Sequence, residues 1–463
     1  MTGGVATEPN EKRWRILLFW WFCHALVSGS ARVIFEANLP NIISNTNEYR
    51  NFKGDDVPLL LSVGTMVTIV GKFSSGPVIA ALTPYGVGVA SLLCCGIVII
   101  GCGIITPISN TPLVSIFLGW NLIRFFQTAT WPASNLLFDA WFPTNEHGRA
   151  WGAMSTASRI GVMIVSFAIA YLNAKTTVQM NFLGCGIALC LYGIILSLNL
   201  ENEPEKREES GRAGVPSDQT IDKDAPEQRK GKRKRFWNEL FDCTIFEPTF
   251  YLAALVQAST TPIAEFQSQV PIWLSMDKTL NSTDINVGVT AWHAGILVSV
   301  LIFGVFFDKV TSDVHKGLLL AAPMLCNYVL FSILLKDFET ESSQDHMVAG
   351  PLMKVGVTFL LGFTVAPAFY LCMGTWTMRH STRRVMATSN SFVDVFGYGG
   401  SVLVLYLQQS GGTEEGNPMK KLIQLFTYCS LSCAIALMVL FAFFEKNYKR
   451  EKEIGRASCR ERV

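Results

Sequence analysis

The fold of this chain is decided by the one long polar stretch in its middle, ENEPEKREESGRAGVPSDQTIDKDAPEQRKGKRKRFWNELFD (residues 201–242). Ten of these residues are Lys or Arg, and few are apolar. Six apolar stretches precede it and six follow it, each about long enough to cross a bilayer, which takes ~20 apolar residues. The pattern predicts an all-α polytopic membrane protein of 12 transmembrane helices in two six-helix halves.

The composition of the 463 residues agrees with a location in the membrane. Half of the residues (50%) are hydrophobic and only 16% are charged, which is more apolar surface than a soluble core needs. The formal net charge of +2 argues against nucleic-acid binding. The twelve Cys residues lack the clustered spacing of a metal site, and no nucleotide loop or nucleophile–base pair is evident. We therefore expect no enzyme and no bound metal or cofactor.

The expected spans define the domain organisation. The N-terminal half (residues 14–200) contains spans at 14–37, 58–82, 85–107, 112–138, 150–173 and 179–200. The C-terminal half (246–444) contains spans at 246–275, 288–308, 316–336, 351–377, 386–408 and 421–444. Outside them we expect an N-terminus (1–13), a charged, disordered linker (201–245) and a tail (445–452). The last residues, EIGRASCRERV (453–463), match a translated sequencing adapter and are interpreted as an assembly artefact.

The distribution of positive charge predicts the orientation in the membrane. If the N-terminus is cytoplasmic, that side collects most of the Lys and Arg outside the spans, including the run from Lys230 to Arg235. By the positive-inside rule both termini and the linker are then cytoplasmic. The basic end of the linker is either a site for anionic lipid headgroups or a solvated tether. We expect a monomer in the plasma membrane or in an organelle membrane, with a small molecule as its substrate.

Two motifs resemble those of the major facilitator superfamily. Between the fourth and fifth spans, residues 147–152 (HGRAWG) are similar to that superfamily's R-G-R-A-x-G string, and residues 304–309 (GVFFDK) resemble its G-x-x-x-D-R signature. The resemblance implies a transporter with alternating access and a cytoplasmic latch formed by Gly304, Asp308, Lys309 and Arg149. The equivalent segment after the second span, from Gly71 to Pro84, lacks the acid and the base that follows it.

A closer resemblance is to the organophosphate:phosphate antiporters of that superfamily. It rests on Trp131-Pro132 preceded by Gln127, on Gly71-Lys72-Phe73, and on Arg32 eight residues before Pro40. The resemblance implies that Arg32 holds a phosphate group. The second phosphate-binding arginine of these antiporters would fall at Ile263, and the seventh span contains no arginine.

Charged residues within the spans are functional candidates, because a charge at bilayer depth costs a few kcal/mol or more. Arg32 and Glu36 lie four residues apart on one helical face, so either Arg32 binds an anion or the two neutralise each other. In the fourth span, Arg124 is either a second cation of the cavity or the partner of an acid. It belongs to a polar stripe that cannot face lipid, formed by Asn121, Arg124, Thr128, Trp131 and Asn135.

The seventh span carries Gln257, Thr261, Glu265 and Gln269, each four residues apart, and a kink is expected at Pro262. Glu265 is the candidate for a titrating group, since a carboxyl group removed from water holds its proton more tightly. It is also a candidate for a gating salt bridge to Arg32 or Arg124.

Other polar residues in the spans have structural interpretations. Arg159 and Asp394 are expected to pair with neighbours, and His293 to be packed rather than to bind a ligand. The string at residues 397–400 (GYGG) predicts close helix packing or a bend.

Together these features predict a secondary active transporter of a small organic anion, with an organophosphate exchanged for phosphate as the narrower hypothesis. The expected substrate-binding residues are Arg32, Arg124, Gln127, Trp131, Gln257 and Thr261. The expected coupling or gating residues are Glu36, Glu265, Arg159 and Asp394. Two alternatives stay open: a proton-coupled symporter of a neutral or zwitterionic solute, and a non-transporting sensor with the same fold.

Overall fold

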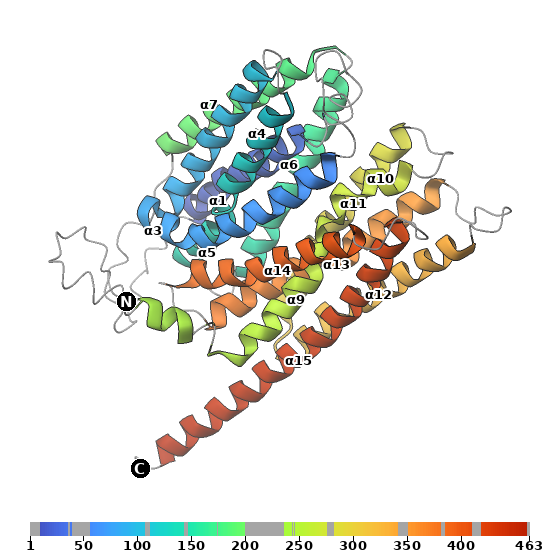
Figure 1. Cartoon of the computed structure of the whole chain (residues 1–463). Coiled ribbons are helices and arrows are strands. Elements are labelled where there is room, and N and C mark those ends of the chain that lie inside the picture. The colour runs from blue at the N-terminus through green and yellow to red at the C-terminus, as the bar shows by residue number, and fades with distance from the viewer. Residues whose placement is uncertain are drawn as a thin grey trace.

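A computed structural model of the chain shows helices throughout the residues that it describes (Figure 1). The described residues are 10–35, 38, 56–106, 112–142, 147–173, 175–199, 236–242, 244, 246–275, 282–340, 351–380, 385–409 and 418–460. The predicted all-α fold is confirmed. Glu36 and the linker residues 201–235 lie outside the described residues, as does the side chain of Arg149. The last part of the linker, residues 236–242, is helical rather than disordered.

The described elements overlap every predicted span, and the last helix continues past its predicted end at residue 444 to Arg460. The first half contains α1 (Asn10–Leu26), the π-helix η1 (Val27–Arg32), α3 (Asp56–Ile105), α4 (Pro112–Gln127), α5 (Thr130–Trp141), α6 (His147–Asn173) and α7 (Val178–Asn199). The second contains α9 (Pro248–Glu265), the 3-10 helix η3 (Phe266–Ser268), α10 (Val270–Ser275), α11 (Ser282–Lys309), α12 (Asp313–Thr340), α13 (Pro351–His380), α14 (Met386–Gln409) and α15 (Pro418–Arg460).

Seven helical segments of the described part are long and apolar enough to cross a membrane. The other predicted spans are also helical, but they are interrupted or more polar. The first span changes to a π-helix, the fourth breaks between α4 and α5, and the seventh breaks at η3. The polar groups and the breaks concentrate in these spans, as expected for helices that line a site within the membrane.

α3 contains two predicted spans joined at Thr83, whose φ of 62° makes the turn between them. Gly71 of the first part and Ser91 of the second part both lie beside the end of α4. Gly64 and Cys102, at the far ends of the two parts, both lie beside the middle of α4. The two parts therefore run in opposite directions, as consecutive membrane spans must.

The two halves have separate apolar cores. One is built from buried residues between Ile16 and Leu196, with Ala387 of α14 added, and the other from residues between Phe250 and Phe444. The halves meet where α3 packs on α14 and α6 packs on α11. Figure 1 shows α14 running alongside the first half, so this helix is the main partner of α3 across the interface.

The string at residues 397–400 packs α14 against α9. A Cβ atom at Gly397 would overlap the side chain of Thr261, and one at Gly400 would overlap the carbonyl oxygen of Ala258. At Gly399, by contrast, a Cβ atom would meet nothing within 4 Å. The predicted close packing is confirmed at Gly397 and Gly400.

Two neighbouring glycines of this string give the first testable prediction. Gly400→Ala should destabilise the protein by about 1–3 kcal/mol, because the added methyl group has no room beside the backbone of α9. Gly399→Ala gains the same helix propensity without the overlap, and should be neutral or stabilising. Thermal unfolding of the detergent-purified variants, followed by tryptophan fluorescence, compares the two, and equal midpoints would contradict the packing described.

Candidate functional site

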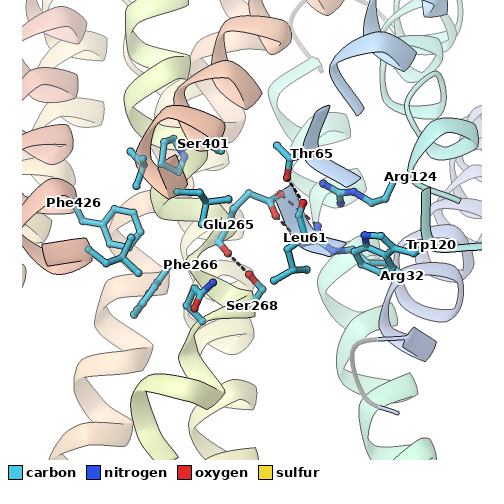
Figure 2. A pocket seen from close by; sticks show the side chains of 15 residues that line it. Arg32, Leu61, Thr65, Trp120, Arg124, Glu265, Phe266, Ser268, Ser401 and Phe426 are labelled. Carbon is cyan, nitrogen blue, oxygen red and sulfur yellow. Dashed lines mark hydrogen bonds and ion pairs between the residues drawn. The ribbon is translucent and has the colours of Figure 1, made fainter. Parts of the chain in front are cut away.

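A small cavity lies between the two halves (Figure 2). It is lined by η1, α3 and α4 on one side and by α9, η3, α14 and α15 on the other. Its volume is about 40 Å³, which accommodates a few water molecules because one needs roughly 10–15 Å³. The charged residues among its lining are Arg32, Arg124 and Glu265.

Arg32 and Glu265 join the two halves at the wall of this cavity. Nη2 of Arg32 donates to Oε2 of Glu265 at 2.7 Å, and Nη1 donates to Oε1 at 3.4 Å (Figure 2). The two side chains are 16% and 23% exposed, so water only partly screens the pair. Of the partners proposed for Arg32, the structure shows the acid of the seventh span, while Glu36 lies outside the described residues.

Small residues position Arg32 at the end of a π-helix. Gly29 of η1 lies against Gly161 of α6: a Cβ atom at Gly29 would overlap the backbone of Gly161, and one at Gly161 would overlap the backbone of Ala25 in α1. The close approach fixes η1 on α6 and leaves Arg32, three residues further on, facing the second half. π-Helical turns occur mostly as local insertions, frequently at functional sites. Hydrophobic periodicity predicts an uninterrupted helix here, so the π-helix was not foreseen.

Glu265 lies at the point where α9 ends and η3 begins. Pro262 lies inside α9, which continues for three more residues to Glu265, and the kink expected at this proline stays a prediction. The break follows Glu265, where the hydroxyl group of Ser268 donates to the carbonyl oxygen of Glu265 at 2.9 Å. The Ser268 side chain thus replaces a backbone bond that the helix gives up, and the carboxylate sits where the α-helix changes to a 3-10 helix.

Arg124 is buried between two aromatic rings on the cavity wall. Its guanidinium carbon lies 5.7 Å from the ring centre of Trp120 on its own helix and 6.0 Å from that of Tyr398 on α14. It is also close enough to Glu265 to act on it electrostatically. The polar stripe of the fourth span is mostly buried, as its pattern predicts, although it is split between α4 and α5.

Arg159 of α6 reaches across to three elements of the second half. Its Nε and Nη2 atoms donate to the hydroxyl oxygen of Tyr370 on α13. Its Nη1 atom donates to Oε1 of Gln267 in η3 at 2.6 Å and lies 3.5 Å from Nδ1 of His293 on α11. The expected structural pairing is therefore with neutral groups, and His293 is packed against this arginine as expected.

Sequence reasoning missed a second ion pair between the halves. Nζ of Lys72 on α3 lies 2.6 Å from Oδ2 of Asp394 on α14, and the two side chains are only 6% and 9% exposed. The amide nitrogens of Gln257 and Asn390 each lie 3.4 Å from a carboxylate oxygen of Asp394. The signal for this pair is in the sequence, because Lys72 is a charge in the middle of an apolar span.

The family assignment comes from comparison with known proteins. The family model of the Major Facilitator Superfamily matches residues 12–405, which include the whole first half and most of the second. The chain belongs to this superfamily. With its apolar helices it is an integral, multi-pass membrane protein, and its family makes it a membrane transporter. No curated protein matches the chain significantly.

Four further predicted site residues of this superfamily member are not among the residues that line the cavity. Gln127 donates to the carbonyl oxygen of Val27 at 3.2 Å and ties α4 to η1. The Trp131 ring lies between the rings of His24 and Tyr370. Thr261 packs against Gly397, and Gln257 contacts Asp394. Their assignment to substrate binding stays a prediction.

The latch expected from the superfamily motifs also stays a prediction. Gly304, Asp308 and Lys309 lie in the last turns of α11, where Gly304 is buried and the two charged side chains are exposed. The fourth expected member, Arg149, lies in the first turn of α6, but its side chain lies outside the described part of the chain.

Proposed function

We propose that this protein is a secondary active transporter of a small organic anion and that its halves alternate in exposing the site. One observation carries the proposal: Arg32 of the first half holds the carboxylate of Glu265 of the second half at the cavity wall. An anionic substrate offers the guanidinium group the same pair of oxygen acceptors. Such a substrate can therefore replace Glu265 on Arg32.

The exchange of partners couples binding to the movement of the halves. With Arg32 bonded to Glu265 the halves are tied together, and with Arg32 bonded to a substrate anion that tie is released. Arg124 and Arg159 act electrostatically on the same carboxylate, so the site attracts negative charge. A carrier that reorients readily only when an anion occupies Arg32 exchanges one anion for another. The narrower proposal is an organophosphate exchanged for phosphate.

The orientation of this transporter is part of the proposal. We place both ends of the chain and the linker on the cytoplasmic side, because the basic residues outside the spans are concentrated there. In this orientation the turn at Thr83 and the start of α14 are both cytoplasmic. They lie at the same end of the molecule, because α3 and α14 meet near them through Gly76 and Thr388.

Anion exchange in proteoliposomes tests the proposal. Wild type should take up labelled phosphate when phosphate or hexose phosphate is present inside, and Arg32→Ala should lose about 10- to 100-fold in rate, since hydrogen bonds to charged groups contribute about 1.5–3 kcal/mol. Arg32→Lys keeps the positive charge but loses the two-pronged guanidinium group, so its rate should lie between those of wild type and Arg32→Ala. Arg15→Ala, an exposed arginine of α1, is the control and should behave as wild type.

Two results would argue against this function. Absence of exchange in folded wild type would remove phosphate from the candidate substrates. Full activity of Arg32→Ala would remove Arg32 from the site.

The same salt bridge favours a second candidate, a proton-coupled symporter of a neutral or zwitterionic solute. If the role of Arg32 is to hold Glu265, then protonation of Glu265 rather than an arriving anion would release the halves. Uptake would then follow a pH gradient without any internal anion. Imposing the gradient across liposomes without internal phosphate separates the two functions.

A further inference from the structure

Arg159 is a buried cation whose hydrogen-bond partners are all neutral, although it also acts electrostatically on the carboxylate of Glu265. Arg159 is only 7% exposed. Its guanidinium group contacts the Tyr370 hydroxyl, the Gln267 amide oxygen and the His293 ring. No carboxylate of the described residues bonds it. Removing a charge from water costs several kcal/mol, and neutral hydrogen-bond partners offset this only in part. Such a cost in the middle of a transporter suggests that Arg159 is kept for a partner that arrives with the substrate.

Arg159 and Arg32 both bond residues at the break in the seventh span, where α9 ends and η3 begins. Arg32 bonds Glu265, the last residue of α9, and Arg159 bonds Gln267, two residues further on in η3. The two arginines come from adjacent elements, because η1 and α6 touch through Gly29 and Gly161. This break in the helix thus presents the carboxylate of Glu265 to one guanidinium group and the uncharged amide of Gln267, which has a similar shape, to the other.

We infer that Arg159 is a second substrate-binding arginine and that the transported solute is a dianion. The inference rests on the proposed function and gives the charge class of its substrate. A monoanion that replaces Glu265 on Arg32 exchanges one negative charge for another and leaves Arg159 with neutral partners. A dianion, such as a phosphate monoester or a dicarboxylate, supplies a second negative charge that takes Arg159 from Gln267 and Tyr370.

Competition between matched anions tests this charge preference. Uptake of labelled phosphate, or of labelled succinate, is measured in proteoliposomes at about pH 8, where a phosphate monoester is a dianion. The competitors are methyl phosphate against dimethyl phosphate, and succinate against monomethyl succinate. Each pair differs mainly by one negative charge. Wild type should be inhibited by the dianion at a concentration at least ~10-fold below that of the monoanion, as expected for one charge-assisted contact.

Substitution of Arg159 should remove the preference without removing the site. In Arg159→Gln the inhibitory concentration of the dianion should rise about 10-fold, while that of the monoanion stays within about twofold, because one charged contact is lost. Arg159→Lys should keep part of the preference, and Arg15→Gln, the same change at an exposed position, should keep all of it. The phosphate and succinate arms also distinguish the two kinds of dianion.

The outcomes separate this inference from the function on which it rests. If wild type carries neither phosphate nor succinate, the proposed function fails. If wild type carries one of them without preferring the dianion, or if Arg159→Gln retains the preference, only the assignment of Arg159 fails. If Arg159→Gln weakened inhibition by the dianion and by the monoanion equally, Arg159 would be a residue that positions η3 rather than one that contacts the substrate.

Discussion

Asp394→Ala is expected to destabilise the folded protein by about 3–5 kcal/mol, which is the usual cost of leaving one partner of a buried ion pair alone. The ammonium group of Lys72 lies 2.6 Å from Asp394 in an interface where both side chains are almost fully buried. Without the carboxylate this ammonium group remains buried between α3 and α14 without a counter-charge. Thermal unfolding in detergent and the yield of monodisperse protein should both fall sharply.

Lys72→Met should be less harmful than Asp394→Ala. After loss of the lysine, Asp394 keeps the amide groups of Gln257 and Asn390 as potential donors at 3.4 Å. Lys72 has no comparable second acceptor among the described residues. The double variant Lys72→Met/Asp394→Leu removes both charges and should recover most of the stability, since apolar replacement of a buried pair is often neutral. A double variant as unstable as Asp394→Ala would show that packing, not charge, explains the loss.

The two ion pairs between the halves differ in their surroundings. The Lys72–Asp394 pair continues into a close contact in which Ser75 and Ser391 are hydrogen-bonded at 2.6 Å and a Cβ atom at Gly76 would overlap Thr388. The Arg32–Glu265 pair lies at a cavity and is partly exposed. A pair enclosed by packing suits a structural role, whereas a pair beside a cavity can exchange partners with a solute.

α9 connects the two pairs mechanically. Gln257 contacts Asp394, and Glu265 bonds Arg32. Gln257 and Glu265 are eight residues apart on α9, a distance of about 12 Å along the helix. A shift of α9 that frees Glu265 therefore also changes the contact at Asp394. A change in the contacts that Glu265 makes is therefore transmitted along the polar face of α9 to the interface between the halves.

The membrane spans were predictable because the bilayer imposes their length and composition on each segment separately. The candidate charges, Arg32 and Glu265 among them, are also recognisable in the sequence, because they lie within apolar segments. Their partners were not predictable. Whether Arg32 pairs with Glu36 or with Glu265, and whether Glu265 pairs with Arg32 or with Arg124, depends on how distant helices pack. Lys72 and Asp394 are 322 positions apart, and Arg159 and Gln267 are 108 positions apart. Hydrophobic periodicity also carries no sign of a π-helix or of the break after Glu265.

Glu265→Gln is expected to tighten anion binding and to slow transport at the same time. In the proposed mechanism the substrate competes with the Glu265 carboxylate for Arg32. An amide keeps the shape of the side chain but gives up a charge-assisted bond of about 1.5–3 kcal/mol, so affinity for the anion should rise about 10- to 100-fold. Without the carboxylate nothing displaces the anion from Arg32, and the maximal exchange rate should fall by a similar factor.

Binding and exchange must be measured on the same Glu265→Gln protein, because the argument depends on their moving in opposite directions. Anion binding is followed by tryptophan fluorescence in detergent, and exchange by uptake of labelled phosphate into liposomes. Glu265→Asp is the matched control, since it retains the charge on a shorter side chain and should lower the rate without a large gain in affinity. If Glu265→Gln binds the anion more weakly, the carboxylate cannot be its competitor. Proton-coupled release of Arg32 would then be the better explanation of the salt bridge between the halves.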